Sequence, residues 1–454
     1  MLKFLFFDYR EIETIHGFRR EPRGPVKCPT NPLFEADEPW ENGNMQLYGS
    51  VVKAPGRPFQ LWYSFIHPPF TIYLGYAESD DGLAWRKPPR DVWEFEGQKT
   101  NVVFAQEPHG PAIIYDDAEE RADWKYKMVC GAAPSHAICA YRSPDGIVWT
   151  PVRPRFPVIS TSPDCPMALL REPDGRYAAF HRLAGHGRRV FRSESWDFLY
   201  WSGEPRMIME PDAGDAAQVQ FYGMGAAAYG SYEIGTLWMY HTDPADPGLG
   251  KMAGYQEAEL TYARQGHCWH RAAQGTPFIP HGEPGSWEQG NLQCASAPVF
   301  LEDEIRYYYA ATTQFHCSRW ELQPQKAGLG MASMKPDRFV ALVAGEETAE
   351  FVTCAFRPPA PHFFVNAKTE GDGWVKVEML DSAGNALPGF TAAGCVPLSG
   401  DSTGQAIVWK PGAAWPEGQD VRLRVQARRA DVYSVFSCEP AETGAYWKFT
   451  AARP

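Results

Sequence analysis

Acidic side chains gather in short polar segments, each of which precedes a strand-like run of the sequence. Cleavage of a glycosidic bond needs one carboxylic acid that protonates the leaving oxygen and a second carboxylate that acts as base or nucleophile. Crowded like charges raise the pKa of one carboxyl group and so supply that acid. Any single one of these residues is more typical of a solvated turn, so only the whole set of acidic residues indicates a site for glycosidic-bond cleavage. The set is Glu35, Asp37, Glu38, Glu41, Glu107, Asp164, Asp212, Asp215 and Glu288.

Histidines form a second group, because several of them stand next to strand-like runs. His109 precedes one run, whereas His181, His241 and His316 each end one. An imidazole there can act as an acid or base or bind a metal, and a hydrogen-bonded structural histidine is the more common alternative. Arg182 follows His181 and is suited to hold an anionic group of a substrate, with an ion pair between neighbouring sheets as its alternative.

The elements that carry these residues have the pattern of short strands, and long helical periodicity is scarce. Runs such as Met45–Lys53, Phe59–Phe65 and Thr71–Ala77 are rich in Tyr, Trp, Val and Ile and are bounded by Gly, Pro or Asp. We therefore predict an all-β fold.

One turn recurs at a spacing that suits the blades of a β-propeller. Ser79-Asp80-Asp81-Gly82-Leu83-Ala84-Trp85 returns as Ser143-Pro144-Asp145-Gly146-Ile147-Val148-Trp149, with weaker copies at 195–201, 262–271 and 335–339. Asp and Gly favour a hairpin turn, and the Trp is expected to pack between adjacent sheets. Intervals of roughly 50–70 residues match one four-stranded blade with its loops. We predict a five-bladed β-propeller over residues 1–345 and, where the turn disappears, a C-terminal β-sandwich over residues 350–454.

Each repeat also has one run that follows a polar, Pro-rich loop, and in a propeller this run is the innermost strand. The loop before it opens onto the central channel, so ligand-binding groups are expected to cluster there. The five runs are 44–52, 110–115, 166–171, 218–226 and 292–300.

The composition excludes several classes of protein. With 43 Lys and Arg against 55 Asp and Glu, the formal net charge is −12, which disfavours nucleic acid as a partner. The ten cysteines form no C-x-x-C pair, so neither a zinc ribbon nor a thioredoxin-type site is indicated. The first residues have no secretory apolar region and no stretch of about 18 apolar residues exists, so we expect no membrane association and a cytoplasmic protein.

Two of the polar segments carry motifs of a known enzyme family. Pro39-Trp40-Glu41-Asn42-Gly43-Asn44, followed by Phe59-Gln60-Leu61-Trp62-Tyr63, resembles the first blade of the five-bladed propeller glycoside hydrolases of families 32, 43 and 68. Asp164-Cys165-Pro166 is similar to the Glu-Cys-Pro acid/base motif in the third blade of family 32. Glu107-Pro108-His109-Gly110-Pro111 stands in the place of that family's Arg-Asp-Pro motif. A propeller followed by a β-sandwich is also the plan of family 32.

The resemblance implies roles for particular residues. Glu41 falls nearest to the nucleophile and Asp164 to the acid, so we predict these two as the carboxylate pair, tuned by His109 and Glu107. Asp8 is a further candidate in the manner of family 43. We predict no cofactor and no metal ligands, although family 43-like propellers often carry calcium or another ion on the axis, so an axial metal stays open. The predicted substrate-binding residues are Trp40, Asn44, His181, Arg182, Asp215, Gln220, Tyr222, His241, Trp287, Glu288 and His316.

The leading hypothesis is therefore a glycoside hydrolase, or a related glycosyl-transferring enzyme, that acts on an oligosaccharide at the propeller axis, with furanosides among the candidate substrates. One alternative is a carbohydrate-binding protein without catalysis, and another is a lyase that uses His109, His181 and Arg182 on a uronic-acid glycan. A fourth hypothesis is that the protein is a structural scaffold. The oligomeric state is left open, with a homo-oligomer among the expectations.

Overall fold

The structure is a computed structural model that describes residues 1–132, 137–154, 156–160, 163–183, 185, 187–242, 254–264, 268–316, 326–409 and 415–440. The regular elements within these residues are strands and two short 3-10 helices, η1 (Pro39–Glu41) and η2 (Ala122–Trp124), without an α-helix. This confirms the all-β prediction. In the part of the chain that is described, no helix has the length and hydropathy to cross a membrane.

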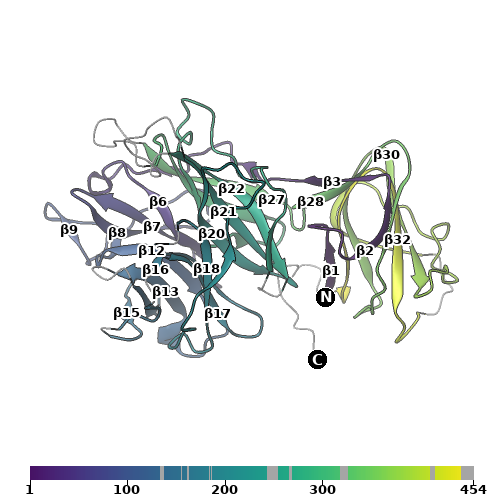
Figure 1. Ribbon diagram of the computed structural model, residues 1–454, viewed down its shortest axis with the longest axis horizontal. Helices are drawn as coiled ribbons and strands as arrows, with labels where there is room; N and C mark the ends of the chain where they lie inside the picture. Colours follow the sequence, from purple (N-terminus) through teal and green to yellow (C-terminus); the bar gives the residue numbers. More distant parts are fainter. Residues whose placement is uncertain are drawn as a thin grey trace.

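Four consecutive antiparallel sheets form the first four blades of a propeller, which lies on the left of Figure 1. In each blade the strands pair in chain order, and in the first blade a hairpin of β9 (Glu94–Phe95) and β10 (Gln98–Lys99) precedes the last strand. The blades comprise β6 (Gln46–Lys53), β7 (Phe59–His67), β8 (Thr71–Ser79) and β11 (Val102–Phe104); β12 (Pro108–Tyr115), β13 (Tyr126–Ala132), β14 (Ile138–Ser143) and β15 (Thr150–Pro151); β16 (Pro163–Arg171), β17 (Tyr177–Leu183), β18 (Val190–Ser195) and β19 (Arg206–Met209); and β20 (Val219–Tyr229), β21 (Tyr232–Thr242), β22 (Gly254–Arg264) and β23 (Cys268–Arg271).

The fifth blade is completed by residues that precede the first blade. β4 (Val26–Lys27) and β5 (Phe34–Glu35) both pair with β27. The blade's own strands are β24 (Leu292–Cys294), β25 (Val299–Phe300), β26 (Ile305–Thr312) and β27 (Ala327–Met334). Hydrogen bonds between distant parts of the chain thus close the ring of five blades, which leaves no open edge between the first and last blades. The predicted five-bladed propeller is confirmed.

The recurrent turn forms the same hydrogen bonds in three blades. The Asp81 carboxylate accepts the backbone N–H groups of Leu83 and Ala84, and Asp145 and Asp197 accept the equivalent pairs. Each of the first two turns also accepts a hydrogen bond from the neighbouring blade. The Tyr308 hydroxyl donates to the Gly82 carbonyl at 2.9 Å, and the Trp62 indole N–H donates to the Gly146 carbonyl at 2.7 Å. The repeated turns therefore join adjacent blades.

The inner strands β6, β12, β16, β20 and β24 line the axis, as predicted from their preceding loops. Near their first residues four of them lose regular register, at 46–50, 109–112, 163–168 and 221–223. Gly110 in the second irregularity has a φ of +62°, and a Cβ there would lie 2.1 Å from the Cys165 sulfur. Such bulges re-aim side chains and are common beside active sites.

The C-terminal region forms one eight-stranded antiparallel sheet, on the right of Figure 1. The sequence predicts a β-sandwich here, and a second hydrogen-bonded sheet does not occur among the described strands of this region. β30 and β32 pair along most of their lengths, with register shifts near Asn366 and between Thr369 and Trp374. The eight strands are β1 (Leu2–Leu5), β2 (Ile12–His16), β3 (Phe18–Pro22), β28 (Val340–Ala344), β29 (Ala349–Thr353), β30 (Phe363–Asp381), β31 (Asp401–Ala406) and β32 (Val421–Ser437).

Residues 2–22 thus belong to this C-terminal sheet, whereas the division drawn from the sequence placed all of residues 1–345 in the propeller. The two units meet around Asp337, which is 2% exposed. Its carboxylate accepts hydrogen bonds from Lys3 of β1, Tyr229 of β20 and Ser434 of β32. A buried ion pair with hydrogen bonds on both oxygens fixes the strands that carry it, so the first and last strands are anchored to the propeller.

Candidate active site at the propeller axis

Side chains from all five blades meet at the end of the axis where the inner strands begin. Tyr48 of β6 packs edge-on against His109 of β12 and stacks against Tyr222 of β20. Arg182 of β17 lies over the Tyr222 ring, 4.5 Å from its centroid. His316 follows β26 of the fifth blade and forms an isolated β-bridge with Gly254 of β22. Its imidazole contacts the same ring, with 5.0 Å between the ring centroids. We call this set, together with Arg188 and Tyr240, the axial cluster.

A hydroxyl–imidazole pair lies at the centre of the axial cluster. The Tyr222 oxygen is 2.7 Å from Nε2 of His316, and the Tyr240 oxygen is 3.4 Å from Nδ1 of the same ring. The backbone N–H of His316 donates to the Gly254 carbonyl, which fixes the position of the imidazole. A tyrosine hydroxyl hydrogen-bonded to a histidine can pass a proton in either direction, and these are two of the side chains that act most often as general acids and bases.

Two guanidinium groups surround this pair. Arg188 lies 4.9 Å from the ring centroids of both Tyr222 and Tyr240, and it donates to the Gln220 side-chain oxygen at 2.9 Å. Arg182 is 5% exposed, whereas Arg188, Gln220, His109 and His316 are half-buried. The cluster therefore combines a dry interior with parts that solvent and a ligand can reach. Positive charge held beside a phenol stabilises negative charge that develops on its oxygen.

Tyr48 keeps its phenolic proton at the buried side of the cluster. Burial, together with the nearby Tyr222 and Cys165 side chains, raises the pKa of Tyr48 well above its ordinary value. The Tyr48 side chain is 4% exposed, and its ring stacks against Tyr222. Tyr48 therefore supports the Tyr222 ring from the interior of the propeller.

Glu41, predicted as the nucleophile, is sealed inside the first blade. It is 0% exposed and ends the short helix η1. Its oxygens accept hydrogen bonds from Lys87, from the Tyr63 hydroxyl and from the backbone N–H of Glu38. Burial raises the pKa of Glu41 although Lys87, Tyr63 and Glu38 all favour its ionised form. A substrate cannot reach this carboxylate, so the structure does not bring it into the axial cluster.

The other two acidic candidates lie closer to the axis. β16 pairs with β17 through Pro163 and Leu183 and through Pro166 and His181, so the backbone of Asp164 runs beside that of Arg182. The Asp164 side chain lies outside the described residues. Glu107 is exposed and has a φ of +50°, two residues before His109.

Most of the remaining predicted residues are held in structural contacts. The Trp40 indole N–H donates to Asn101, and the Asn44 side chain accepts the N–H of Ile66. His181 is fully buried between the Arg182 carbonyl and the Ser193 hydroxyl, and burial lowers its pKa to about 4, so it stays neutral.

The polar candidates of the fourth and fifth blades are ion-paired or stacked. Asp215 pairs with Arg271, which also binds Glu259. His241 contacts Glu257 at 3.1 Å and stacks on Tyr255. Glu288 binds Lys27 and the Tyr309 hydroxyl, while Trp287 stacks on the Tyr309 ring.

Asp8 lies away from the axis. It pairs with Arg264, the last residue of β22, and accepts a hydrogen bond from the Tyr262 hydroxyl. Burial opposes its ionisation, but the hydrogen bonds from Arg264, Arg10 and Tyr262 outweigh it and lower the pKa of Asp8 to about 2. Asp8 thus anchors the N-terminal segment on the fourth blade.

The structure therefore brings together five of the predicted residues: His109, Arg182, Gln220, Tyr222 and His316. Tyr48, Arg188 and Tyr240 were missed by the sequence reasoning. A usable signal was present for Tyr48, because Gly49 follows it inside the strand-like run, and a glycine within a strand marks a bulge. Within the described residues, no group of three or more His, Cys, Asp and Glu is arranged to hold a metal ion.

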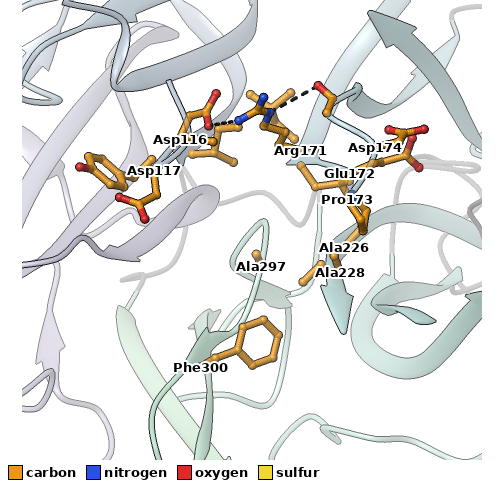
Figure 2. Close-up of a pocket in the computed structure, with 17 residues that line it drawn as sticks. Asp116, Asp117, Arg171, Glu172, Pro173, Asp174, Ala226, Ala228, Ala297 and Phe300 are labelled. Carbon is orange, nitrogen blue, oxygen red and sulfur yellow. Dashed lines mark hydrogen bonds and ion pairs between the residues drawn. The ribbon is translucent and has the colours of Figure 1, made fainter. Parts of the chain in front are cut away.

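A pocket of about 560 Å³ occupies the opposite end of the inner strands (Figure 2). Ala226, Ala228, Ala297 and the Phe300 ring line one side of it. Its other side carries the charged groups Asp116, Arg171 and Glu172, and Figure 2 shows the ion pair between Asp116 and Arg171. We call it the far-end pocket.

The charged groups of the far-end pocket are bound to one another or to the blades. Asp116 is 3% exposed and pairs with Lys127, Arg171 and the Tyr177 hydroxyl. Glu172 pairs with Arg192 and Arg176. These carboxylates serve as ion-pair partners within the scaffold, so the axial cluster is the better candidate for catalysis.

No protein-family model matches the sequence, and no curated protein matches it. Several solved structures align with it. A glycosyl hydrolase from Bacteroides ovatus is 15% identical, covers 70% of this chain and 94% of its own, and has a TM-score of 0.49. A structure from the GH130 family of mannoside phosphorylases, which contains glycoside hydrolases that target β-1,2 mannosidic linkages in Candida mannan, has the same identity and coverage and a TM-score of 0.48. The β-1,2-mannobiose phosphorylase from Listeria innocua is 12% identical over 68% of this chain and 96% of its own, with a TM-score of 0.46. Similarity at this level carries no argument about the reaction of this chain, which has to be argued from its own side chains.

Proposed function

We propose that the protein cleaves a glycosidic bond of an oligosaccharide bound at the axial cluster, with Tyr222 and His316 carrying the proton transfers. The observation that carries the proposal is the 2.7 Å contact between the Tyr222 oxygen and His316 Nε2, at the point where all five blades contribute side chains. Every cleavage of a glycosidic bond must deliver a proton to the leaving oxygen, and a hydroxyl–imidazole pair is suited to this task.

The backbone supports the same location. Four inner strands lose regular register within a few residues of Tyr48, His109, Asp164 and Tyr222. Each bulge interrupts ladder hydrogen bonds, a cost that is tolerated where a side chain must be aimed at a ligand. The half-buried His109, Gln220 and Arg188 supply hydrogen-bond donors and acceptors for sugar hydroxyl groups. Asp164 is proposed as an additional acid of the site because its backbone runs beside Arg182.

The test is a product screen that detects cleavage of any oligosaccharide chain. Wild-type protein is incubated with neutral, furanosidic and uronic-acid oligosaccharides, and the products are separated by mass. Tyr222→Phe keeps the ring and removes the hydroxyl, and we expect it to lower turnover about 10²-fold or more.

Tyr177→Phe is the matched control, because it removes an equally buried hydroxyl at the far end of the propeller. We expect its turnover to stay within about twofold of wild type, since it touches no group of the axial cluster. Thermal stabilisation by a sugar without cleavage of any substrate would contradict the proposal and indicate a binding protein instead.

A further inference from the structure

We infer that the substrate is a uronic-acid oligosaccharide and that its glycosidic bond is broken by β-elimination, with Arg182 and Arg188 holding the carboxylate of the sugar. This inference rests on the proposed function and adds to it the class of substrate and the class of reaction.

Recognition of a carboxylate follows from the two guanidinium groups. Arg182 and Arg188 approach the same phenol ring, at 4.5 and 4.9 Å from its centroid, and come from β17 and from the segment that follows it. A guanidinium is a planar fork of N–H donors that matches the two oxygens of a carboxylate, and it is less strongly hydrated than an ammonium group. Arg182 is 5% exposed, and in such a dry setting a charged hydrogen bond is stronger than in water.

The same arrangement places the acid–base pair beside the carboxylate. Neutralising the carboxylate of a uronic acid makes the hydrogen on the adjacent ring carbon easier to remove, because the negative charge that develops there spreads onto the carboxylate oxygens. Tyr222 is in contact with both guanidinium groups and with His316, so a carboxylate held by the two arginines brings that hydrogen to the phenol oxygen.

The step balances without a further reactant. As the phenol proton of Tyr222 moves to Nε2 of His316, the phenol oxygen takes the proton from the carbon next to the carboxylate. The electron pair of that C–H bond becomes a carbon–carbon double bond, and the bond from the neighbouring carbon to the glycosidic oxygen breaks. The departing oxygen takes the proton held by His316. One oligosaccharide gives two shorter ones, one of them unsaturated, and no water is consumed.

Most glycoside hydrolases use a second carboxylate to attack the sugar or to activate water. Glu41, which the sequence offers for that role, is 0% exposed and bound to Lys87 and Tyr63. Elimination requires no such nucleophile, so it needs neither Glu41 nor a second carboxylate beside the proposed acid Asp164.

The test uses the full-length protein with three probes: a 4-linked oligogalacturonate, the same oligomer after reduction of its carboxyl groups, and a neutral oligosaccharide. Chain breaks are counted by mass, and the conjugated double bond is followed by its ultraviolet absorbance. We expect breaks only with the free acid, with one absorbing product for every break.

Two neighbouring arginines provide the variant pair. Arg188→Gln is expected to lower kcat/KM for the free acid about tenfold or more, because a charged hydrogen bond to the carboxylate is lost. Arg189→Gln removes an arginine that pairs with Glu210 at the surface, and it is expected to stay within about twofold of wild type.

Two results would overturn the inference. Breaks without the absorbing product, or breaks of the carboxyl-reduced probe at the rate of the free acid, would refute elimination and carboxylate recognition while leaving the proposed glycosidic cleavage in place. Absence of breaks in every oligosaccharide of the wider screen would refute the proposed function itself.

Discussion

The two ends of the propeller axis are built from the same five inner strands but in opposite ways. At the end with the axial cluster, strand register is broken, and the buried phenols of Tyr48, Tyr222 and Tyr240 lie against half-buried imidazoles and the half-buried Arg188 guanidinium. At the far end the ladders run without a break through residues 112–115 and 168–171. There the charged groups are buried carboxylates that are bound by arginine and lysine.

Asp116 illustrates the far end. Burial opposes its ionisation, yet hydrogen bonds from Tyr177 and Lys127 outweigh this effect and lower the pKa of its carboxyl group. A carboxylate with a cation or hydroxyl on each oxygen stabilises the blades and cannot exchange protons readily. Acidic residues near a propeller axis are therefore not by themselves catalytic. What matters is whether the fold leaves a titratable group in partial contact with solvent.

The largest expected effect separates the two ends by activity. Tyr222→Phe should reduce kcat by about 10²–10⁴-fold, because the hydroxyl that exchanges a proton with His316 is gone. The free energy of unfolding should change by only about 1 kcal/mol, the value of one hydrogen bond. Steady-state kinetics and urea unfolding of the same preparation measure both quantities. Equal activity of the variant and wild type would remove the axial cluster from catalysis.

The second effect separates the ends by stability. Lys127 is 0% exposed and binds Asp116, Glu119 and the Trp124 carbonyl. Lys127→Met removes one cation from the buried Asp116, which keeps Arg171, and from the half-buried Glu119, which keeps Arg121, so the free energy of unfolding should fall by about 3 kcal/mol. The folded fraction should keep its turnover. A stability loss below about 1 kcal/mol would show that the far-end pairs are not structural.

Glu41 provides an intermediate case, because the family resemblance places it in the active site and its burial places it in the scaffold. Glu41→Gln removes the partner of Lys87, and we expect a loss of about 1–3 kcal/mol in the free energy of unfolding. Turnover should stay within about threefold of wild type, whereas a catalytic carboxylate would cost about 10²-fold or more. Kinetics at a temperature well below the unfolding midpoint distinguish these outcomes.

A further effect is a change in pH dependence at the far end. Burial, reinforced by Glu172, raises the pKa of Glu233 from an ordinary 4.5 to about 8, although Arg192 favours its ionised form. Between these values the unfolded chain has lost this proton and the folded chain keeps it, so folding stability contributed by Glu233 falls as pH rises through this window and levels off above it. Glu233→Gln should flatten that fall, which urea unfolding at several pH values between about 5 and 9 would reveal. A pH profile identical to that of wild type would place the Glu233 proton elsewhere in the network.

Features of the fold that depend on neighbours in the chain were predictable from the sequence. Asp81, Asp145 and Asp197 each bind backbone N–H groups two and three residues away, so the turn and its spacing can be recognised in the amino-acid sequence. The run 335–339 looks like a further copy, but its Asp337 is buried at the junction with the C-terminal sheet, where it binds Lys3 and Ser434. The sequence could not distinguish a turn in a blade from a turn between units.

The all-β class, the repeated turn and the loops that open on the axis were determined by the sequence alone, because hydrogen bonds and side-chain alternation over a few residues set them. Closure of the fifth blade by β4 and β5, the transfer of residues 2–22 to the C-terminal sheet and the choice of catalytic candidates were decided only by the tertiary structure. Glu41 and Tyr222 both lie close to the start of an inner strand, yet one faces Lys87 within a blade and the other faces His316 from another blade. Their partners are 46 and 94 residues away, and such long-range pairings form only when the strands that carry them have assembled.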